Sequence, residues 1–151
     1  MLVKYHFVLG AIFSILVYTL FQITPTQAII IFLASFLIDF DHYLIYVIDK
    51  KNLSLKKSYK YFSQHKEKWV KLSKQQKNQY KNYLLIFHGI EFIILLLVLS
   101  FLSNIFLYIL IGILFHLFLD YIDIIYYKGN ISSKLSQIYV LITNKNKKQL
   151  V

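Results

Sequence analysis

The chain alternates between long, uninterrupted apolar stretches and short polar connectors. Four of these stretches approach or exceed the roughly 20 residues of helix that a bilayer core requires, and they are Tyr5–Ile23, Thr26–Ile48, Tyr83–Leu102 and Asn104–Tyr127. Runs of this length are too long for strands, and a helix satisfies its own backbone polar groups in lipid. The pattern therefore predicts an all-α integral membrane protein built as a four-helix bundle.

Composition agrees with this class. The 151 residues are 58% hydrophobic and include one proline and four glycines, which fits neither a disordered chain nor a typical soluble domain. Lys4 followed by an apolar run only weakly imitates a cleaved signal peptide, because a second apolar run follows almost at once. We expect the first run to stay in the protein as a membrane helix. Without cysteine, a metal site would have to use nitrogen and oxygen ligands.

The lysines lie outside the apolar stretches and predict the orientation. Residues 49–81 hold 11 lysines against Asp49 and Glu67, a net charge of +9, whereas the connectors 24–27 and 103–104 carry no charge. The positive-inside rule then places both termini and the long loop in the cytoplasm, with the protein in the plasma (inner) membrane. We divide the chain into a first helix pair (1–48), a basic loop (49–81), a second helix pair (82–127) and a basic tail (128–151).

The same charge pattern predicts the partners. The chain has no arginine, and its lysines flank the predicted membrane segments. This pattern favours membrane lipids with anionic headgroups over nucleic acid as partners. The sequence is also compatible with a homodimer. Within the loop, apolar residues recur every three or four positions, at Tyr59, Phe62, His65, Trp69 and Leu72. This spacing predicts an amphipathic helix on the cytoplasmic leaflet, with a solvated, partly ordered connector as the alternative. We expect a short interfacial helix within 131–143 and a polar, frayed tail over 144–151.

Acidic residues and histidines interrupt the apolar stretches, whereas lysines do not. They are His6, Asp39, Asp41, His42, His88, Glu91, His116, Asp120 and Asp123. Ionisable groups at membrane depth usually face a protein interior or a water-filled cavity and mark a functional site. Counted at 1.5 Å per residue from the cytoplasmic helix ends, those after His6 lie roughly 6–17 Å deep. His6 lies on the same side at a shallower depth, so the whole set falls in the cytoplasmic half.

Spacing along the predicted helices adds chemistry to this set. Three carboxylate–imidazole pairs are three or four residues apart and so share a helix face, namely Asp39–His42, His88–Glu91 and His116–Asp120. Such pairs on facing helices build metal sites in bundle proteins, and nitrogen–oxygen ligand sets suit zinc, manganese or iron. Several acids in one layer would repel each other without a cation, although a proton relay could use the same residues.

The order of these residues also resembles a known family. His6, the run Leu-Ile-Asp-Phe-Asp-His at 37–42, His88 and the run His-Leu-Phe-Leu-Asp at 116–120 follow one another along the chain. This order resembles the YdjM-type family of membrane-bound metal-dependent hydrolases over residues 1–127, without the loop and tail. Ile38 stands where that family has proline, and the third-helix pattern of two histidines bracketing Arg-Gly is reduced to His88 and Gly89. The resemblance implies a divalent-metal site and, beyond it, hydrolysis.

We therefore expect one or two divalent ions, zinc or manganese. The expected ligands are His6, Asp39, His42, His88, His116 and Asp120. Asp41 is out of phase with Asp39 on an ideal helix, so either the helix is distorted there or Asp41 orients a ligand. We expect Glu91 to act as a general base. The predicted function is hydrolysis of a phosphoester or lipid-linked substrate at the cytoplasmic leaflet. A small metal or proton transporter or sensor, and a structural membrane protein, stay open as alternatives.

Overall fold

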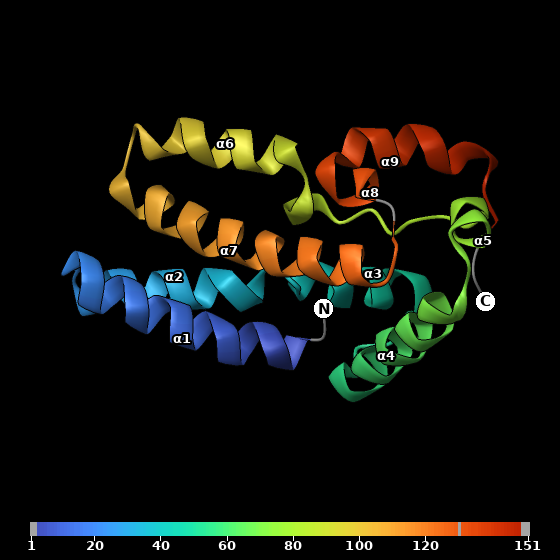
Figure 1. Ribbon diagram of the computed structural model, residues 1–151, viewed down its shortest axis with the longest axis horizontal. Coiled ribbons are helices and arrows are strands. Elements are labelled where there is room, and N and C mark those ends of the chain that lie inside the picture. The colour runs from blue at the N-terminus through green and yellow to red at the C-terminus, as the bar shows by residue number, and fades with distance from the viewer. Residues whose placement is uncertain (1–2, 130, 149–151) are drawn as a thin grey trace. The chain divides into compact units, whose positions relative to one another are not determined.

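The computed structural model describes residues 3–129 and 131–148, and its named elements are helices (Figure 1). They are α1 (Val3–Phe21), α2 (Pro25–Leu37), α3 (Phe40–Lys50), α4 (Leu55–Lys71), α5 (Lys74–Gln79), η1 (Ile86–His88), α6 (Ile90–Ser100), α7 (Asn104–Tyr126), α8 (Ser132–Leu135), α9 (Gln137–Thr143) and η2 (Asn144–Asn146). The predicted all-α class is confirmed for these residues. The chain forms two compact units: unit 1 comprises Met1–Asp39 and Ile90–Asp123, and unit 2 comprises Phe40–Gly89 and Ile124–Val151.

Three helical stretches among the described residues are long and apolar enough to cross a membrane: α1, the α2–α3 stretch Pro25–Lys50, and α7. These features indicate a membrane protein. The third predicted span, Tyr83–Leu102, is helical over the 11 residues of α6, and the prediction is wrong for the residues before it. There the chain forms the short 3-10 helix η1, and Gly89 has extended backbone angles (φ −93°, ψ 158°).

The second predicted span is also interrupted. α2 ends at Leu37 and α3 begins at Phe40, with a two-residue turn between them. Asp39 lies in that turn, where its N–H donates to the carbonyl of Phe36 at 3.4 Å, three residues back rather than four. The helix that would carry Asp39 and His42 on one face is interrupted at this turn, so their pairing stays a prediction. The break at Gly89 likewise lies between His88 and Glu91 in the sequence, and their pairing also stays a prediction.

Unit 1 is held together by close helix packing. The connection from α1 to α2 ends in a capping box, in which Thr24 and Gln27 satisfy each other's backbone N–H groups, followed by Pro25 in the first turn. A Cβ added to Gly112 of α7 would lie 2.4 Å from the carbonyl oxygen of Ile31 in α2. Small residues allow such an approach in membrane helices, so Gly112 fixes how closely α7 and α2 pack.

In unit 2 the predicted loop helix is confirmed as α4, and part of its aromatic side packs against protein. The ring of Phe62 meets the ring of His42 edge to face with centroids 5.2 Å apart. Tyr61 lies beside Tyr46, and its hydroxyl is 3.0 Å from the hydroxyl of Tyr83. α4 is thus attached to α3 and to the segment before η1. Its contact with the leaflet stays a prediction.

The C-terminal segment belongs to the fold of unit 2. The N–H of Lys81 donates to the carbonyl of Lys148 at 2.8 Å, and the N–H of Lys148 donates to Gln79 at 2.9 Å. Asn144 accepts a hydrogen bond from the N–H of Asn82 and donates one to its carbonyl. The prediction of a frayed tail is therefore wrong for residues 144–148, and residues 149–151 lie outside the described part.

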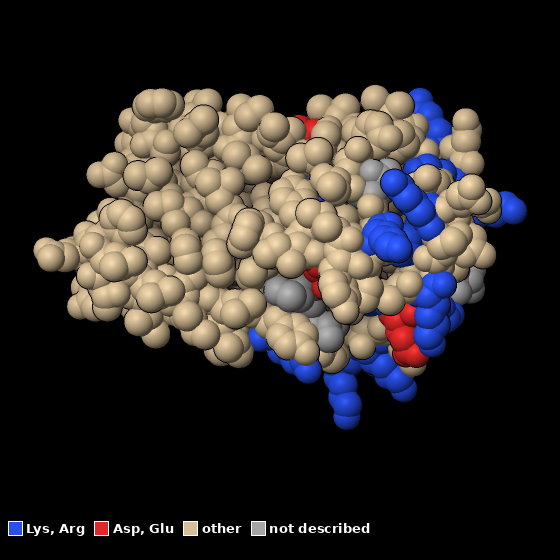
Figure 2. Space-filling view, in the orientation of Figure 1, with Lys and Arg blue, Asp and Glu red and all other residues tan. Residues whose placement is uncertain are grey.

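Charge is distributed unevenly over the two units. On the face seen in Figure 2, most of the surface over unit 1 is uncharged, and lysines gather over unit 2. Large apolar side chains of unit 1 are widely exposed, among them Ile15, Leu20 and Phe101. Contiguous exposed apolar surface is rare on soluble monomers, and this surface agrees with the three apolar spans.

Candidate metal centre

Four predicted ligands meet inside unit 1. His6 comes from α1, Asp39 from the turn after α2, and His116 and Asp120 from successive turns of α7. His6, Asp39 and His116 each offer a ligand atom, and these three atoms lie within 4.8 Å of one another. His6 and His116 are fully buried, and the two carboxylates are almost so. The predicted pairing of His116 with Asp120 on one helix face is confirmed.

The separations in this cluster match those between ligands of one ion. The Nε2 atom of His6 lies 3.3 Å from Oδ1 of Asp120. The Nε2 atom of His116 lies 3.6 Å from Oδ2 of Asp120 and 3.7 Å from Oδ1 of Asp39. Ligand atoms at about 2.0–2.2 Å from a tetrahedral zinc ion are about 3.3–3.6 Å apart. His6, Asp39 and His116 could therefore hold a small divalent ion, with Asp120 beside His6 and His116.

The hydrogen bond of His116 defines which of its nitrogens can bind. Nδ1 lies 2.8 Å from the backbone carbonyl oxygen of Ser35, and because a carbonyl can only accept, Nδ1 carries the proton. In the neutral ring the lone pair is then on Nε2, the atom that approaches the carboxylates of Asp39 and Asp120. A lone pair and two carboxylates repel one another, and a cation among them converts repulsion into coordination.

Sequence reasoning missed Ser35, although a signal for it exists. It is a small, buried polar residue in an apolar helix, the type that lines close helix contacts in membranes. Its side chain donates to the carbonyl of Phe32, and its own carbonyl is left to accept from His116. Such a contact fixes the ring orientation of a metal-binding histidine.

His6 is the clearest sign that the cluster holds a ligand. Its side chain is fully buried, and neither ring nitrogen has a hydrogen-bond partner among the described residues. Its ring stacks on the ring of His116 with centroids 3.8 Å apart. Buried polar side chains almost always have a partner, and two stacked imidazolium ions would repel each other. A metal ion bound at Nε2 would give this nitrogen a partner, and it requires a neutral ring, which removes the repulsion.

Unit 2 contains a second histidine arrangement, built around Asp41. One carboxylate oxygen accepts from Nδ1 of His42 at 3.0 Å, and the other accepts from Nδ1 of His88 at 2.9 Å. Asp41 and His88 are buried. A carboxylate bonded to Nδ1 leaves Nε2 as the ligating nitrogen, which is how outer carboxylates orient metal-binding histidines. Asp41 thus makes the contacts expected of a residue that orients metal ligands. That His42 and His88 bind the same ion as the ligands of unit 1 stays a prediction.

The sequence also singled out Glu91 and His65. Glu91 is half-buried in the first turn of α6 in unit 1, and its role as a general base stays a prediction. His65 of α4 lies with Nδ1 3.3 Å from the hydroxyl of Tyr83 and stacks on Trp69. Burial and the charge of Lys68 hold the pKa of His65 below its ordinary value. Its contacts agree with the prediction that it belongs to the apolar face of the loop helix.

Comparisons with known proteins give no family for the chain. No family model matches it, and no curated protein or solved structure shows significant similarity to it. The resemblance to the YdjM-type family therefore stays a prediction.

Proposed function

We propose that this chain is a four-helix integral membrane protein and a metal-dependent hydrolase, acting on a phosphoester or lipid-linked substrate at the cytoplasmic leaflet. One observation carries the proposal. The fully buried His6, without a hydrogen-bond partner in the described residues, lies against His116 and Asp120 at separations that suit a shared divalent ion.

The membrane part of the proposal rests on the apolar helices. α1, Pro25–Lys50 and α7 provide three crossings, and α6 provides the fourth. The 11 residues of α6 cover about 16 Å, roughly half of a hydrocarbon core about 30 Å thick. The rest of this crossing is the non-helical segment up to Gly89. Non-helical backbone is tolerated at membrane depth where protein surrounds it, and Leu85, His88 and Gly89 are buried.

The metal part rests on the chemistry of the ligands. Imidazole and carboxylate, without thiolate, suit zinc or manganese, and the two clusters provide for one or two ions. A bound divalent ion supplies Lewis-acid polarisation of a phosphoryl or carbonyl oxygen and a more acidic water. The residues of the chain supply orientation: Ser35 holds His116, and Asp41 holds His42 and His88.

The hydrolytic part of the proposal gives roles to Glu91 and to the lysines of α4. Glu91, which like Asp123 is a half-buried carboxylate of unit 1 outside the ligand cluster, would accept the proton of the attacking water. The burial of the cluster excludes bulk water, which strengthens electrostatic interactions with a reacting group. Lysines of α4 attract anionic headgroups to the cytoplasmic side.

A turnover experiment with four variants tests this function. Purified full-length protein in mixed micelles is supplied with zinc or manganese and with phospholipid and isoprenoid-phosphate substrates, and released phosphate or headgroup is measured. We expect Glu91→Gln to keep the metal and lose turnover, because the amide keeps the shape but cannot accept a proton. We expect His116→Gln to lose both. Glu67→Gln and His65→Gln, which alter residues of the loop helix, are the matched controls and should keep both.

The same preparation separates the hydrolase from its main alternative. Metal bound by the wild type with no turnover on any substrate, together with metal or proton flux into proteoliposomes that His116→Gln abolishes, would overturn the hydrolase and favour a transporter. Turnover that Glu91→Gln leaves unchanged would remove Glu91 from the proposal while leaving the hydrolase in place.

A further inference from the structure

The C-terminal helices of unit 2 expose apolar side chains that the function above does not use. α8 and α9 are short, yet most of their large apolar residues are well exposed, with Ile142 of α9 at 63%. The exposed residues are Leu135, Ile138, Tyr139, Leu141 and Ile142. Ile138, Leu141 and Ile142 follow one another at intervals of three and one, so they form one side of the helix. We call these three residues the outer side of α9.

The opposite side of α9 is fixed to unit 2. Val140 is fully buried, and Gln137 accepts a hydrogen bond from the N–H of Leu85 at 2.8 Å. Just beyond the helix, Asn144 exchanges two hydrogen bonds with Asn82. These contacts hold the helix in one rotational setting. The outer side therefore cannot turn inward to bury its apolar residues without breaking them.

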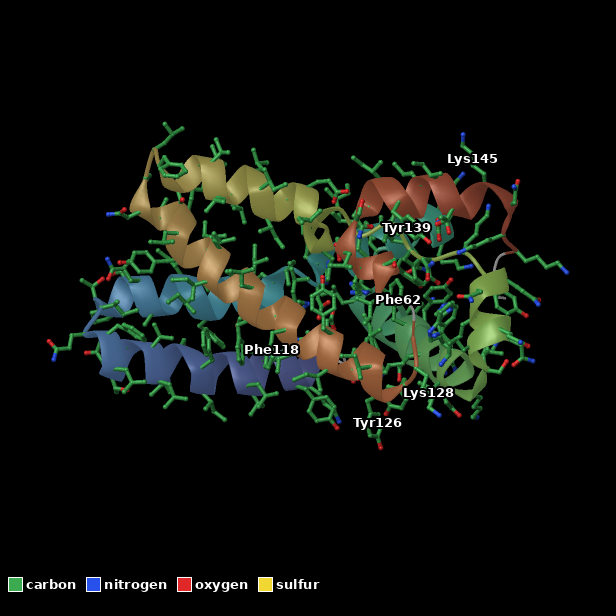
Figure 3. The ribbon with its side chains drawn as sticks, turned by 45° about the horizontal axis from the view of Figure 1, so that its top comes forward. Phe62, Phe118, Tyr126, Lys128, Tyr139 and Lys145 are labelled. Atoms are coloured by element: carbon green, nitrogen blue, oxygen red, sulfur yellow. The ribbon has the colours of Figure 1, made fainter. Side chains whose placement is uncertain are left out.

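Charge and chain length indicate what covers the outer side. The chain from Tyr127 to Lys148 contains five lysines and no acidic residue. Lys145 extends away from the end of α9 in Figure 3. The five residues between α7, which ends at Tyr126, and α8, which begins at Ser132, reach at most about 18 Å. α8 and α9 thus begin close to the end of a helix that is long and apolar enough to cross a membrane.

We propose that α8 and α9 form an interfacial anchor, which inserts the outer side of α9 into an anionic cytoplasmic leaflet. The apolar side chains enter the boundary between headgroups and acyl chains, and the flanking lysines contact anionic phosphates. Because Gln137 and Asn144 hold the segment from Asn82 to Leu85, the anchor also ties the chain leading to His88 to the membrane surface. This inference rests on the membrane location in the proposed function and is independent of the metal.

Fluorescent labels on single cysteines test the anchor in the full-length protein. The chain has no cysteine of its own, so Ile138→Cys and Ile142→Cys each carry a bimane label at one known site. The variants are reconstituted into vesicles of phosphatidylcholine with phosphatidylglycerol. Quenching is compared between aqueous iodide and lipids that carry a nitroxide near the headgroup or deep in the acyl chain. Lys145→Cys, beyond the helix, is the matched polar control, and Ile15→Cys in α1 marks a candidate membrane span.

The anchor predicts a definite quenching pattern. Labels at 138 and 142 should be quenched by the shallow nitroxide, and their iodide quenching should be about tenfold weaker than at 145, because the outer side lies roughly 5–10 Å into the interface. Removing phosphatidylglycerol should weaken this protection.

Iodide access at 142, with deep-lipid quenching at 15, would overturn the anchor alone. Iodide access at both would overturn the membrane location itself. Protection at 142 without any lipid quenching would mean that protein, such as a second copy, covers the outer side, and this would overturn the anchor.

Discussion

Replacing Gly112 by alanine tests whether helix packing in unit 1 sets the geometry of the metal centre. The added Cβ would lie 2.4 Å from the carbonyl oxygen of Ile31 and 2.8 Å from the Cβ of Ala34. Neither neighbour can rotate away, because one belongs to the backbone and the other is fixed to it. α7 and α2 must therefore move apart. Raising 2.4 Å to 3.0 Å, below which such contacts are essentially never seen, requires a shift of about 0.6 Å.

The shift would reach the metal centre because α7 carries His116 and α2 carries Ser35, whose carbonyl orients His116. One turn along from Gly112 and Ile31, His116 donates to the carbonyl of Ser35 at 2.8 Å. The same separation would stretch this hydrogen bond to about 3.4 Å, where it is weak. Loss of a contact that orients a ligand costs about 10–100-fold in metal affinity, and overpacking costs about 1–3 kcal/mol of stability. We expect both losses in Gly112→Ala.

The assay is zinc competition against a chromogenic chelator in detergent micelles, with thermal unfolding measured on the same sample. Leu114→Ala is the control, because Leu114 is an exposed residue of the same helix and its loss should leave zinc affinity unchanged. If Gly112→Ala bound zinc as tightly as the wild type, the contact between α7 and α2 would not orient His116. The link from packing to the centre would then be refuted.

Three further predictions concern unit 2 and the topology. Asp41→Asn leaves one acceptor oxygen for two histidine donors, so zinc affinity should fall about 10–100-fold, whereas Asp49→Asn should not change it; equal affinities would remove the orienting role. Because the pKa of His65 is held below its ordinary value of 6.5, the unfolded state binds its proton more readily, and the free energy of unfolding should fall as pH drops through 6.5. His65→Gln should reduce that slope in denaturant titrations, and an unchanged slope would contradict this. Cysteines at position 65 and at Ser103 should be labelled from the cytoplasm and from outside, respectively, and the reverse pattern would overturn the orientation.

The features of the fold that depend on long apolar runs could be predicted from the sequence. α1 and α7 lie close to the predicted stretches, because nothing in those runs competes with helix. The phase of Asp39 and Asp41 indicated a distorted helix as one alternative, but the position of the break after Leu37 could not be predicted, because no proline or glycine marks it. The extended backbone at Gly89 is also set by tertiary contacts, as His88 is held by Asp41 from a distant part of the chain.

The candidate metal centre could likewise be predicted only in part. Charge placement indicated which residues matter, and helix spacing correctly paired His116 with Asp120. Spacing alone could not place Asp39 relative to His42, because it assumes an unbroken helix. It also could not reveal the contact of His116 with Ser35, which lies 81 positions away. Likewise, the periodicity of α4 predicted an apolar side but not that α3 would cover part of it, because a pattern in one helix carries no information on its neighbour.

The direct test of the central claim is the metal content of the purified full-length protein. Elemental analysis, before and after equilibration with zinc or manganese and removal of excess ion, should find at least one ion per chain in the wild type. His6→Gln and His116→Gln should lose an ion each time, and His65→Gln should keep the wild-type content. A wild-type protein without stoichiometric metal under both conditions, or equal metal in all four proteins, would contradict a metal centre built on His6 and His116.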